Sequence, residues 1–307
     1  MHTLVPTYYK NFKCIADKCQ HSCCIGWEVD IDPKKLKYYN SLSGEISLLL
    51  KENIDLYPEP HFILKEGDRC PFLKENGLCH LICELGEDAL CGICSDHPRF
   101  RNFYSKGEEM GLGLCCEEAA RIILLNSEPF KLEGNGDIYS NEEKQYAELR
   151  DKYISIVQNT EVPFKERLFE LLNVARAQID AESFNNWISF FLSLERLNES
   201  WTELLLNPGM QAFDFNVDQD KSKLLANLCT YFIFRHITPE AFEEGADQRI
   251  TFCVLATVFI HTLTVGNLDK YGSYEDTLCH ISRMFSSEIE YSDENLNLVL
   301  DEILFLR

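Results

Sequence analysis

Cysteine is unevenly distributed along this chain of 307 residues. Eleven of its fourteen cysteines lie between Cys14 and Cys116. Three chemistries use clustered cysteine, namely disulfide formation, zinc binding and iron–sulfur cluster binding. The clustered residues are Cys14, Cys19, Cys23 and Cys24 in a first group, Cys70, Cys79, Cys83, Cys91 and Cys94 in a second, and the adjacent pair Cys115 and Cys116.

Disulfides are the least expected of the three. Small secreted domains use them because they cannot bury enough apolar surface, whereas this chain is long and 45% hydrophobic. Its first residues, MHTLVPTYYKNFKC, lack the basic start, apolar run and cleavage site of a secretory signal. We therefore expect a cytoplasmic protein with reduced thiols.

The cysteine spacing is compatible with an iron–sulfur site, with a zinc site, or with no metal site. Cys91 and Cys94 are separated by two residues, so both thiolates can reach one metal or cluster from a single turn. A second contributing segment, around Cys19 and Cys23, is what such sites usually require. Neighbours such as Cys23 and Cys24 seldom both bind one ion, so one of each adjacent pair is expected to be a core residue.

Several other residues near the cysteines have two interpretations. His21, His80 and His97 are candidate ligands or proton carriers, but a hydrogen-bonded loop histidine is the simpler explanation. Arg99 is a candidate for holding an anionic group of a substrate or cofactor, with an ordinary salt bridge as the alternative. Trp27 is expected to pack over the sulfur-rich site and limit its access to solvent.

Net charge narrows the possible partners. The formal charge is −21, and this makes nucleic-acid binding unlikely because that affinity depends on lysine and arginine. A lysine-bearing partner would be attracted, although solubility alone explains an acidic surface. The longest apolar run, Ile250 to Leu263, is shorter than the ~20 residues that cross a membrane. It predicts a buried core helix and no membrane association.

The patterning predicts a mainly α protein, with a loop-rich cysteine region at residues 1–125 packed on an α-helical bundle at 140–307. The polar stretch at 132–145 is expected to be a linker or exposed loop. One helical face combines Phe164, Leu168, Leu171, Leu172, Ala175 and Ile179. Further helices are predicted near 184–206, 220–237, 249–265, 275–287 and 293–306, with Ser292 or Asp293 as the N-cap of the last.

The motifs resemble the flagellin lysine N-methylase family and, more distantly, small cysteine-rich proteins that chelate zinc or iron. The first matching block is YKNFKCIADKCQHSCCIGWEVDID at residues 9–32. RCPFLKENGLCHLICELGEDALCGICSDHPRF follows at 69–100, and LCCEEAARIIL at 114–124 is similar to a helix start in that family. YFIFRHI at 231–237 resembles an aromatic-arginine segment. Cys83 departs from the pattern and is interpreted as an extra thiol.

The resemblance implies a methyltransferase that modifies lysine side chains of flagellin, with S-adenosylmethionine as methyl donor and an iron–sulfur cluster, most simply 4Fe-4S, as a further cofactor. Zinc is the alternative metal. A non-catalytic zinc- or iron-chelating protein and a redox or electron-transfer iron–sulfur protein are the alternative functions. The candidate ligands are Cys14, Cys19, Cys23, Cys24, Cys70, Cys79, Cys91 and Cys94, among which Cys19, Cys23, Cys91 and Cys94 are preferred.

Methylation of lysine requires the neutral amine, because the ammonium group has no lone pair. An aromatic pocket with a nearby carboxylate can favour that form. Tyr231, Phe232 and Phe234 are candidate pocket residues, and Arg235 is a candidate for holding the carboxylate of the donor. The simpler interpretation of this segment is a buried aromatic helix face with one arginine reaching the surface. No catalytic residue is predicted.

Overall fold

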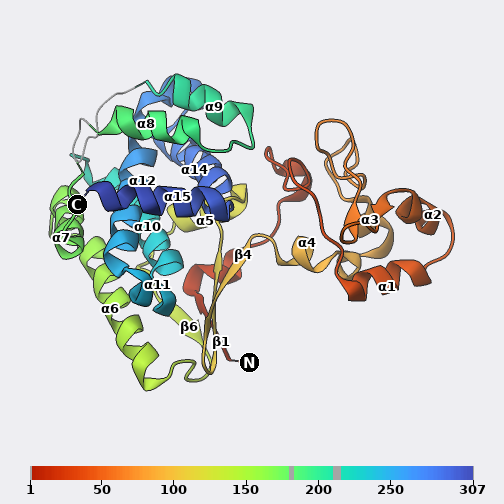
Figure 1. Cartoon of the computed structure of the whole chain (residues 1–307), viewed down its shortest axis with the longest axis horizontal. Coiled ribbons are helices and arrows are strands. Elements are labelled where there is room, and N and C mark those ends of the chain that lie inside the picture. The colour runs from red at the N-terminus through yellow and green to blue at the C-terminus, as the bar shows by residue number, and fades with distance from the viewer. Residues whose placement is uncertain (1, 180–182, 210–215, 307) are drawn as a thin grey trace. The chain divides into compact units, whose positions relative to one another are not determined.

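The computed structural model describes residues 2–179, 183–209 and 216–306. The chain divides into two compact units (Figure 1). We refer to Lys13–Arg99 as the cysteine-rich unit. The helical unit combines Met1–Phe12 with Phe100–Arg307. The cysteine-rich unit is thus shorter than the predicted range 1–125, because residues 2–12 and 100–125 belong to the helical unit.

The prediction of a mainly α protein is confirmed, since 59% of the chain is helical and 10% is strand. The helical unit contains most of these helices. They are α5 (Glu117–Leu124), α6 (Asn141–Gln158), α7 (Phe164–Ala175), α8 (Phe184–Ser193), α9 (Glu199–Leu206), α10 (Gln219–His236), α11 (Pro239–Glu244), α12 (Ala246–Gly266), α13 (Leu268–Tyr271), α14 (Tyr274–Phe285) and α15 (Asp293–Ile303).

Helix α12 forms the centre of this unit and packs against α7, α10, α14 and α15. Every residue from Ile250 to Thr264 is buried, as predicted for a core helix. Among the described helices, α12 alone is long and apolar enough to span a membrane, and 83% of its apolar window is buried inside the protein. A core helix of a globular protein passes the same test, and the packing around α12 favours that interpretation.

Aromatic side chains fill much of the space around α12. Phe191 and Phe259 lie with ring centroids 4.6 Å apart, and Phe285 contacts both Phe191 and Trp201. Buried aromatic residues contribute large apolar areas, and tilted or edge-on ring pairs add to that stabilisation.

A small sheet lies beside the helices in the order β4-β5-β1-β6. Its strands are β1 (His2–Pro6), β4 (Arg99–Tyr104), β5 (Gly107–Leu112) and β6 (Leu132–Gly134). β1 is parallel to β5 and antiparallel to β6. The first strand of the chain therefore pairs with strands that follow the cysteine-rich unit in sequence.

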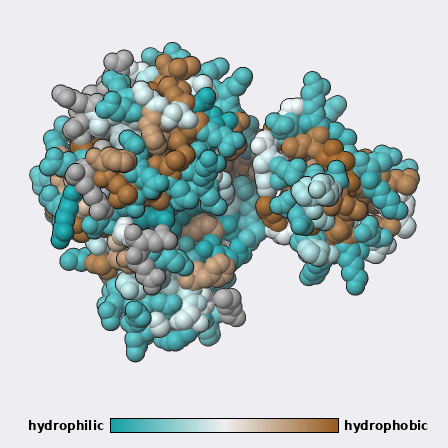
Figure 2. Space-filling view, in the orientation of Figure 1, coloured by the Kyte–Doolittle hydropathy of each residue, from teal (hydrophilic) through white to brown (hydrophobic). Residues whose placement is uncertain are grey.

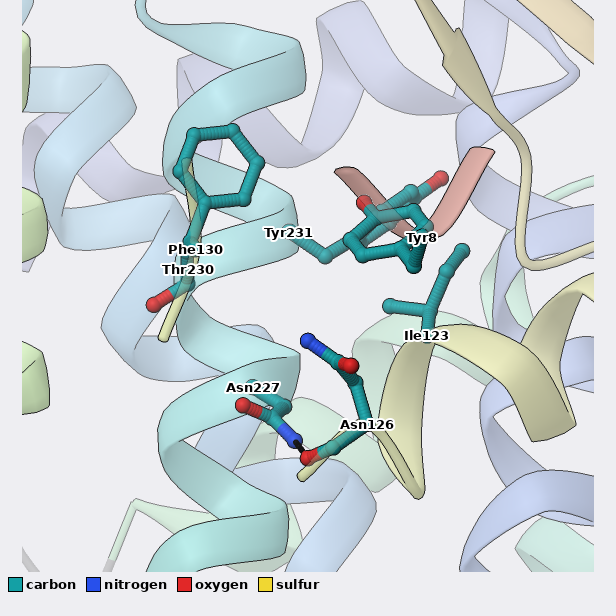
Figure 3. Close-up of a pocket in the computed structure, with 7 residues that line it drawn as sticks. All are labelled: Tyr8, Ile123, Asn126, Phe130, Asn227, Thr230 and Tyr231. Atoms are coloured by element: carbon teal, nitrogen blue, oxygen red, sulfur yellow. Dashed lines mark hydrogen bonds between the residues drawn. The ribbon is translucent and has the colours of Figure 1, made fainter. Parts of the chain in front are cut away.

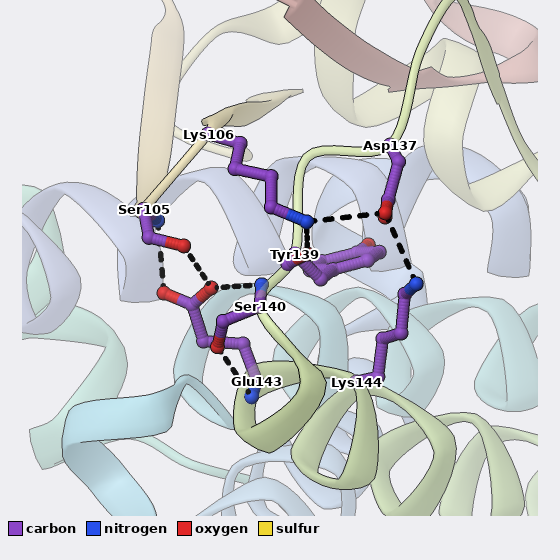
Figure 4. Close-up of polar contacts among 7 residues, drawn as sticks. All are labelled: Ser105, Lys106, Asp137, Tyr139, Ser140, Glu143 and Lys144. Carbon is purple, nitrogen blue, oxygen red and sulfur yellow. Dashed lines mark hydrogen bonds and ion pairs between the residues drawn. The ribbon is translucent and has the colours of Figure 1, made fainter.

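The start of α6 is attached to the turn between β4 and β5. Ser140 is the N-cap, and its side chain accepts a hydrogen bond from the Glu143 amide while Glu143 accepts one from the Ser140 amide. Glu143 also accepts hydrogen bonds from the amide and hydroxyl of Ser105 (Figure 4). Asp137 pairs with both Lys106 and Lys144. Residues 132–145 are therefore not the predicted linker, because they form β6, a clamped turn and the start of α6.

Most of the predicted helices are found, with differences in detail. The range 184–206 contains two helices, α8 and α9, separated by residues 194–198. The predicted face of α7 is buried, but Ile179 lies beyond the end of that helix. Ser292 caps α15 by accepting a hydrogen bond from Asn295, while Asp293 is the first helical residue. Helix α6 was not predicted as a separate element.

The cysteine-rich unit consists of short elements. They are α1 (Pro33–Ser41), α2 (Glu45–Glu52), α3 (His80–Leu85), α4 (Gly92–Asp96) and the antiparallel pair β2 (Ile54–Asp55) and β3 (His61–Phe62). A separate small core holds them together, in which Phe62 packs edge-on against Phe72 at 4.7 Å. Thiols make up part of this core, in which Cys70 and Cys91 are buried.

Candidate functional site

Five cysteines share the core of the cysteine-rich unit. Cys70 and Cys91 are buried within it, and Cys24, Cys79 and Cys94 are partly buried against it. All fourteen cysteines of the chain are free thiols. The structure therefore brings both sulfur-rich segments of the sequence to one place.

Backbone hydrogen bonds explain how the two segments meet. The Cys70 amide donates to the Cys24 carbonyl at 2.8 Å, and the neighbouring residues Ile25 and Arg69 form a β-bridge. A turn then returns the chain so that Leu73 bridges to Cys79. Turn residues such as Cys-Pro and Asn-Gly in this stretch make that return possible. Cys24, Cys70 and Cys79 consequently lie on adjacent backbone segments.

Cys91 and Cys94 are positioned by α4 and by contacts from α1. Cys91 is the N-cap of α4, and the following amide, Gly92, donates to Asp32 Oδ2 at 2.8 Å. Asp32 also caps α1 through the Lys35 amide. The Tyr39 hydroxyl lies 3.4 Å from Cys91 Sγ and donates to the carbonyl of Ala89 at 2.6 Å. Asp32 and Tyr39 thus fix the turn that carries Cys91 and Cys94.

The thiols are close enough to change one another's ionisation. A hydrogen bond from Cys23 lowers the pKa of Cys24 to about 7, and a hydrogen bond from Cys94 lowers the pKa of Cys91. The Cys91 contact raises the pKa of Cys94 in return. Burial, supported by the nearby thiols of Cys24, Cys79 and Cys91, raises the pKa of Cys70 to about 12. Such mutual influence is expected of groups that share a small volume.

The other predicted ligands lie outside this core. Cys14 is exposed, as is Cys83, which was interpreted as an extra thiol. The Cys19 thiol donates to the carbonyl of His21 at 3.3 Å, and Cys23 is exposed beside Cys24. Trp27 packs against the core and donates to the Cys23 carbonyl at 2.7 Å. Within the preferred set, the structure therefore brings Cys91 and Cys94 together with Cys24 in place of Cys23.

The described residues contain no group of three or more histidine, cysteine or acidic side chains already arranged to hold a metal ion. The donor chemistry of the five core thiols nevertheless fits zinc and iron–sulfur clusters, both of which take thiolate ligands. Binding would require rotation of side chains that sit on a fixed backbone.

The histidines and Arg99 that the sequence singled out have varied surroundings. His80 lies 3.9 Å from Glu84, and burial lowers the pKa of His97, whose Nε2 is buried without a hydrogen-bond partner. Arg99 Nη1 donates to the carbonyl of Ser95 at 3.2 Å. Its guanidinium group thus binds a backbone carbonyl near the C-terminal end of α4.

Tyr231 and Arg235 belong to a polar centre in the helical unit. Both contact Glu290, whose side chain is fully buried at the end of a π-helical turn, Ser286–Glu290. His236 Nε2 lies 2.7 Å from the same carboxylate. Burial by itself would raise the pKa of Glu290, but Arg235 and His236 outweigh it, so the pKa lies below its usual value. Arg235 and Tyr231 therefore have an internal partner, and a donor carboxylate would have to compete with Glu290.

A second buried ion pair joins β5 to α6. Arg150 contacts both oxygens of Glu109, at 2.6 and 2.8 Å, and the side chains are 1% and 0% exposed. Tyr104 and Tyr139 both donate to the Glu109 carboxylate. The two-pronged geometry and the tyrosines satisfy the charges, as a buried pair requires.

A small cavity lies between η1 (Thr7–Asn11), α5 and α10. Figure 3 shows its lining, which is Tyr8, Ile123, Asn126, Phe130, Asn227, Thr230 and Tyr231. Its volume of about 10 Å³ is enough for one water molecule and too small for a nucleoside cofactor. The hydroxyl of Thr230 is buried without a partner, which suits a water site.

Sequence reasoning did not identify Asp32, Tyr39 or the acidic members of the two buried centres, Glu109 and Glu290. The Asp-Pro pair at Asp32 is a signal for the start of α1, and that helix would have placed Tyr39 on its buried face. No comparable signal marks Glu109 or Glu290, because the chain contains fifty acidic residues and most acidic residues are solvated.

Comparison with known proteins gives three related matches. The chain is 30% identical over 127 residues to a flagellar biosynthetic protein, FliU, of Salmonella muenchen, covering 39% of this chain and 75% of FliU. It is also 30% identical over 127 residues to lysine-N-methylases of Salmonella choleraesuis (strain SC-B67) and Salmonella typhimurium (strain LT2). Those matches span 31% of each methylase. No family model and no solved structure matches the chain.

Proposed function

This chain belongs to the flagellin lysine N-methylase family, and from that premise we propose that it methylates lysine side chains of flagellin in the cytoplasm. We propose S-adenosylmethionine as the donor and an iron–sulfur cluster as a further cofactor. The chain is matched over about a third of the length of the lysine-N-methylases, so the activity is a proposal for this chain. The observation that carries it is the convergence of five thiols in one small core.

We propose Cys24, Cys70, Cys91 and Cys94 as the ligands of the cluster. The pKa of Cys94 is affected by Cys91, Cys24 and Cys70, and that of Cys70 by Cys24, Cys79 and Cys91. Cys70 and Cys91 are buried in the core, and Cys24 and Cys94 pack against it. Cys79 is the fifth thiol of the core and the natural replacement if one ligand is lost. Four thiolates are the usual ligand set of a four-iron cluster, which supplies one-electron transfer when it is bound.

In the methyl transfer itself, the lone pair of the lysine nitrogen forms a bond to the methyl carbon while the carbon–sulfur bond of the donor breaks. The sulfonium becomes a thioether, and the nitrogen releases a proton. The lysine must enter this step as a neutral amine, so the chain has to bind it where burial disfavours its charge.

The donor contacts of Arg99, Tyr231 and Arg235 stay predictions. Arg99 binds backbone carbonyls of α4, close in sequence to Cys94. Arg235 lies between the rings of Phe100 and Tyr291, at 5.0 and 4.5 Å from their centroids. Its contact with Glu290 favours a role in organising the helical unit over a role in holding the donor.

The test begins with anaerobic purification, followed by visible absorption and by iron and zinc analysis of the same sample. A broad band near ~400 nm with about four irons per chain supports the cluster. Colourless protein with one zinc would contradict it. The variants Cys70→Ser and Cys91→Ser should lose most of the iron, whereas the matched controls Cys14→Ser and Cys83→Ser, which alter exposed thiols, should retain it.

Methyl transfer is measured separately, with radiolabelled S-adenosylmethionine and purified flagellin monomer. Labelled methyl-lysine in flagellin is the expected product. Protein with a full complement of iron that transfers no label to flagellin would contradict the methylase proposal and leave the ligand assignment standing.

A further inference from the structure

A tip of the cysteine-rich unit exposes apolar side chains. Leu56 and Tyr57 lie in the connection between β2 and β3, and they are 63% and 83% exposed. Large apolar residues that protrude together, surrounded by polar groups, commonly mark sites of protein interaction. Figure 2 shows apolar surface on the cysteine-rich unit beside hydrophilic side chains. We refer to residues 54–61 as the β2–β3 tip.

Local hydrogen bonds and prolines restrict the backbone of the β2–β3 tip. Asp55 Oδ1 accepts a hydrogen bond from the Tyr57 amide at 3.0 Å, and the Glu59 carbonyl lies 2.8 Å from His61 Nδ1. Pro58 and Pro60 further restrict the backbone. A preordered segment loses little conformational entropy when it binds a partner. The exposed side chains are therefore suited to act as anchors.

The tip is built directly on the core that holds the thiols. Phe62, at the end of β3, is buried and packs against Phe72 and Tyr39. Tyr39 in turn contacts Cys91. A partner bound at the tip would therefore be held by the same rigid body as the proposed cluster site.

The acidic residues around the β2–β3 tip indicate which kind of partner surface the tip can bind. Residues 52–64 contain the acids Glu52, Asp55 and Glu59 and no lysine or arginine. Asp55 and Glu59 are exposed on either side of Leu56 and Tyr57. An aromatic anchor flanked by carboxylates complements a surface that combines lysine with apolar side chains.

We propose that the β2–β3 tip docks the lysine-bearing substrate protein, through Leu56 and Tyr57 as anchors and Asp55 and Glu59 as partners of its lysines. This inference rests on the proposed function for the identity of the partner. It adds a binding surface separate from the thiols and from the two buried ion-pair centres.

The experiment measures binding of purified flagellin monomer to the full-length, iron-loaded protein by calorimetry. Four forms are compared: wild type, Leu56→Ser/Tyr57→Ser, Asp55→Asn/Glu59→Gln, and the control Leu206→Ser. Leu206 lies in α9 of the helical unit and is 62% exposed, so it matches Leu56 in type and exposure. Asparagine at position 55 keeps an oxygen that can accept from the Tyr57 amide.

The double serine variant should raise Kd roughly tenfold, as truncation of an interface anchor usually does. The amide variant should weaken binding at low salt and remove most of its salt dependence. The control should bind like the wild type. Unchanged binding by both tip variants, or no binding of flagellin by the wild type, would overturn the proposal.

A second readout separates this proposal from the methylase assignment. Transfer of label to a short lysine peptide, too small to reach the tip, should proceed equally in all four forms. If the wild type binds flagellin through the tip but labels neither flagellin nor the peptide, the methylase proposal fails and the docking proposal stands.

Discussion

The helical unit and the cysteine-rich unit differ in the polar groups that lie in and around their cores. In the helical unit, buried charges such as Glu109 and Glu290 face arginine partners, and apolar side chains fill the remaining core. In the cysteine-rich unit, short helices surround a small core in which Cys70 and Cys91 are buried among aromatic and aliphatic side chains, and further thiols pack against that core. We propose that these thiols bind a metal group that stabilises the cysteine-rich unit, whereas the stability of the helical unit depends on its internal ion pairs and apolar packing.

Removal of the proposed iron–sulfur cluster should have the largest effect on stability. Metal binding contributes folding free energy directly, on the order of 10 kcal/mol at structural thiolate sites. We expect iron chelation under reducing conditions to abolish hydrogen-exchange protection in residues 13–99 and to leave α10 and α12 protected. Equal hydrogen-exchange protection of the cysteine-rich unit with and without iron would contradict the proposal that this unit depends on iron for its stability.

A substitution in the helical unit tests how much the buried ion pair between Glu109 and Arg150 contributes to stability. Glu109→Gln leaves the buried Arg150 with only the exposed Asp151, at 3.7 Å, as a counter-charge, so the free energy of unfolding should fall by about 3 kcal/mol. Replacing both residues, as Glu109→Gln/Arg150→Met, should recover much of that loss.

The exposed pair Lys10 and Glu133 provides the control, because Glu133→Gln should cost about 1 kcal/mol or less. Urea unfolding is followed by tryptophan fluorescence in a Trp27→Phe background, so that the signal comes from Trp187 and Trp201 of the helical unit. A loss for Glu109→Gln as small as that of the control would show that the buried pair is not needed.

Low pH should lower the free energy of unfolding of the helical unit. Burial alone would raise the pKa of Glu109, but Arg150 and hydrogen bonds from Tyr139 and Tyr104 lower it below 4.5 overall, despite the nearby Asp151. A carboxyl whose pKa is lower in the folded state stabilises the protein above its unfolded pKa. The stabilisation should therefore be complete near neutral pH and be lost as pH falls below about 4.5.

The measurement is the urea midpoint of the helical unit between pH 7 and pH 4. Glu109→Gln should show a shallower decline than the wild type, because it lacks one of the groups that titrate. Parallel curves for the two proteins would exclude Glu109 as a source of acid sensitivity.

The smallest expected effect concerns the contact between α1 and the thiols. Tyr39→Phe removes a hydroxyl that donates to Ala89 and touches Cys91, so it should destabilise the cysteine-rich unit by about 1 kcal/mol. Tyr38→Phe, at the adjacent exposed position, is the matched control and should have no measurable effect. Hydrogen exchange of α4 in the iron-loaded protein distinguishes the two variants.

The sequence predicted the helical unit better than the site. Helices α7, α10 and α12 carry long apolar patterns, and their positions follow from those patterns alone. Helix α6 begins in a polar stretch that looks like a loop, and its start is defined by the capping contacts of Ser140 and Glu143. Local propensity therefore predicted the exposed loop within residues 132–145 but missed β6 and the start of α6 at its two ends.

The thiol core was only partly predictable. The two-residue gap between Cys91 and Cys94 predicted that they lie together, and the structure places them on one short helix. The placement of Cys24 against the core, with Cys23 outside it, depends on the hydrogen bond between Cys24 and Cys70. Spacing along the chain contains no information about that long-range register.

The position of the cysteine-rich unit between β1 and β4 has a consequence for biosynthesis. The partners of β1 are residues 107–112 and 132–134, which leave the ribosome only after the whole of Lys13–Arg99. The thiol core can therefore form during translation while β1 still lacks a sheet to join. Folding of the cysteine-rich unit and completion of the helical unit become successive events, ordered by the direction of protein synthesis.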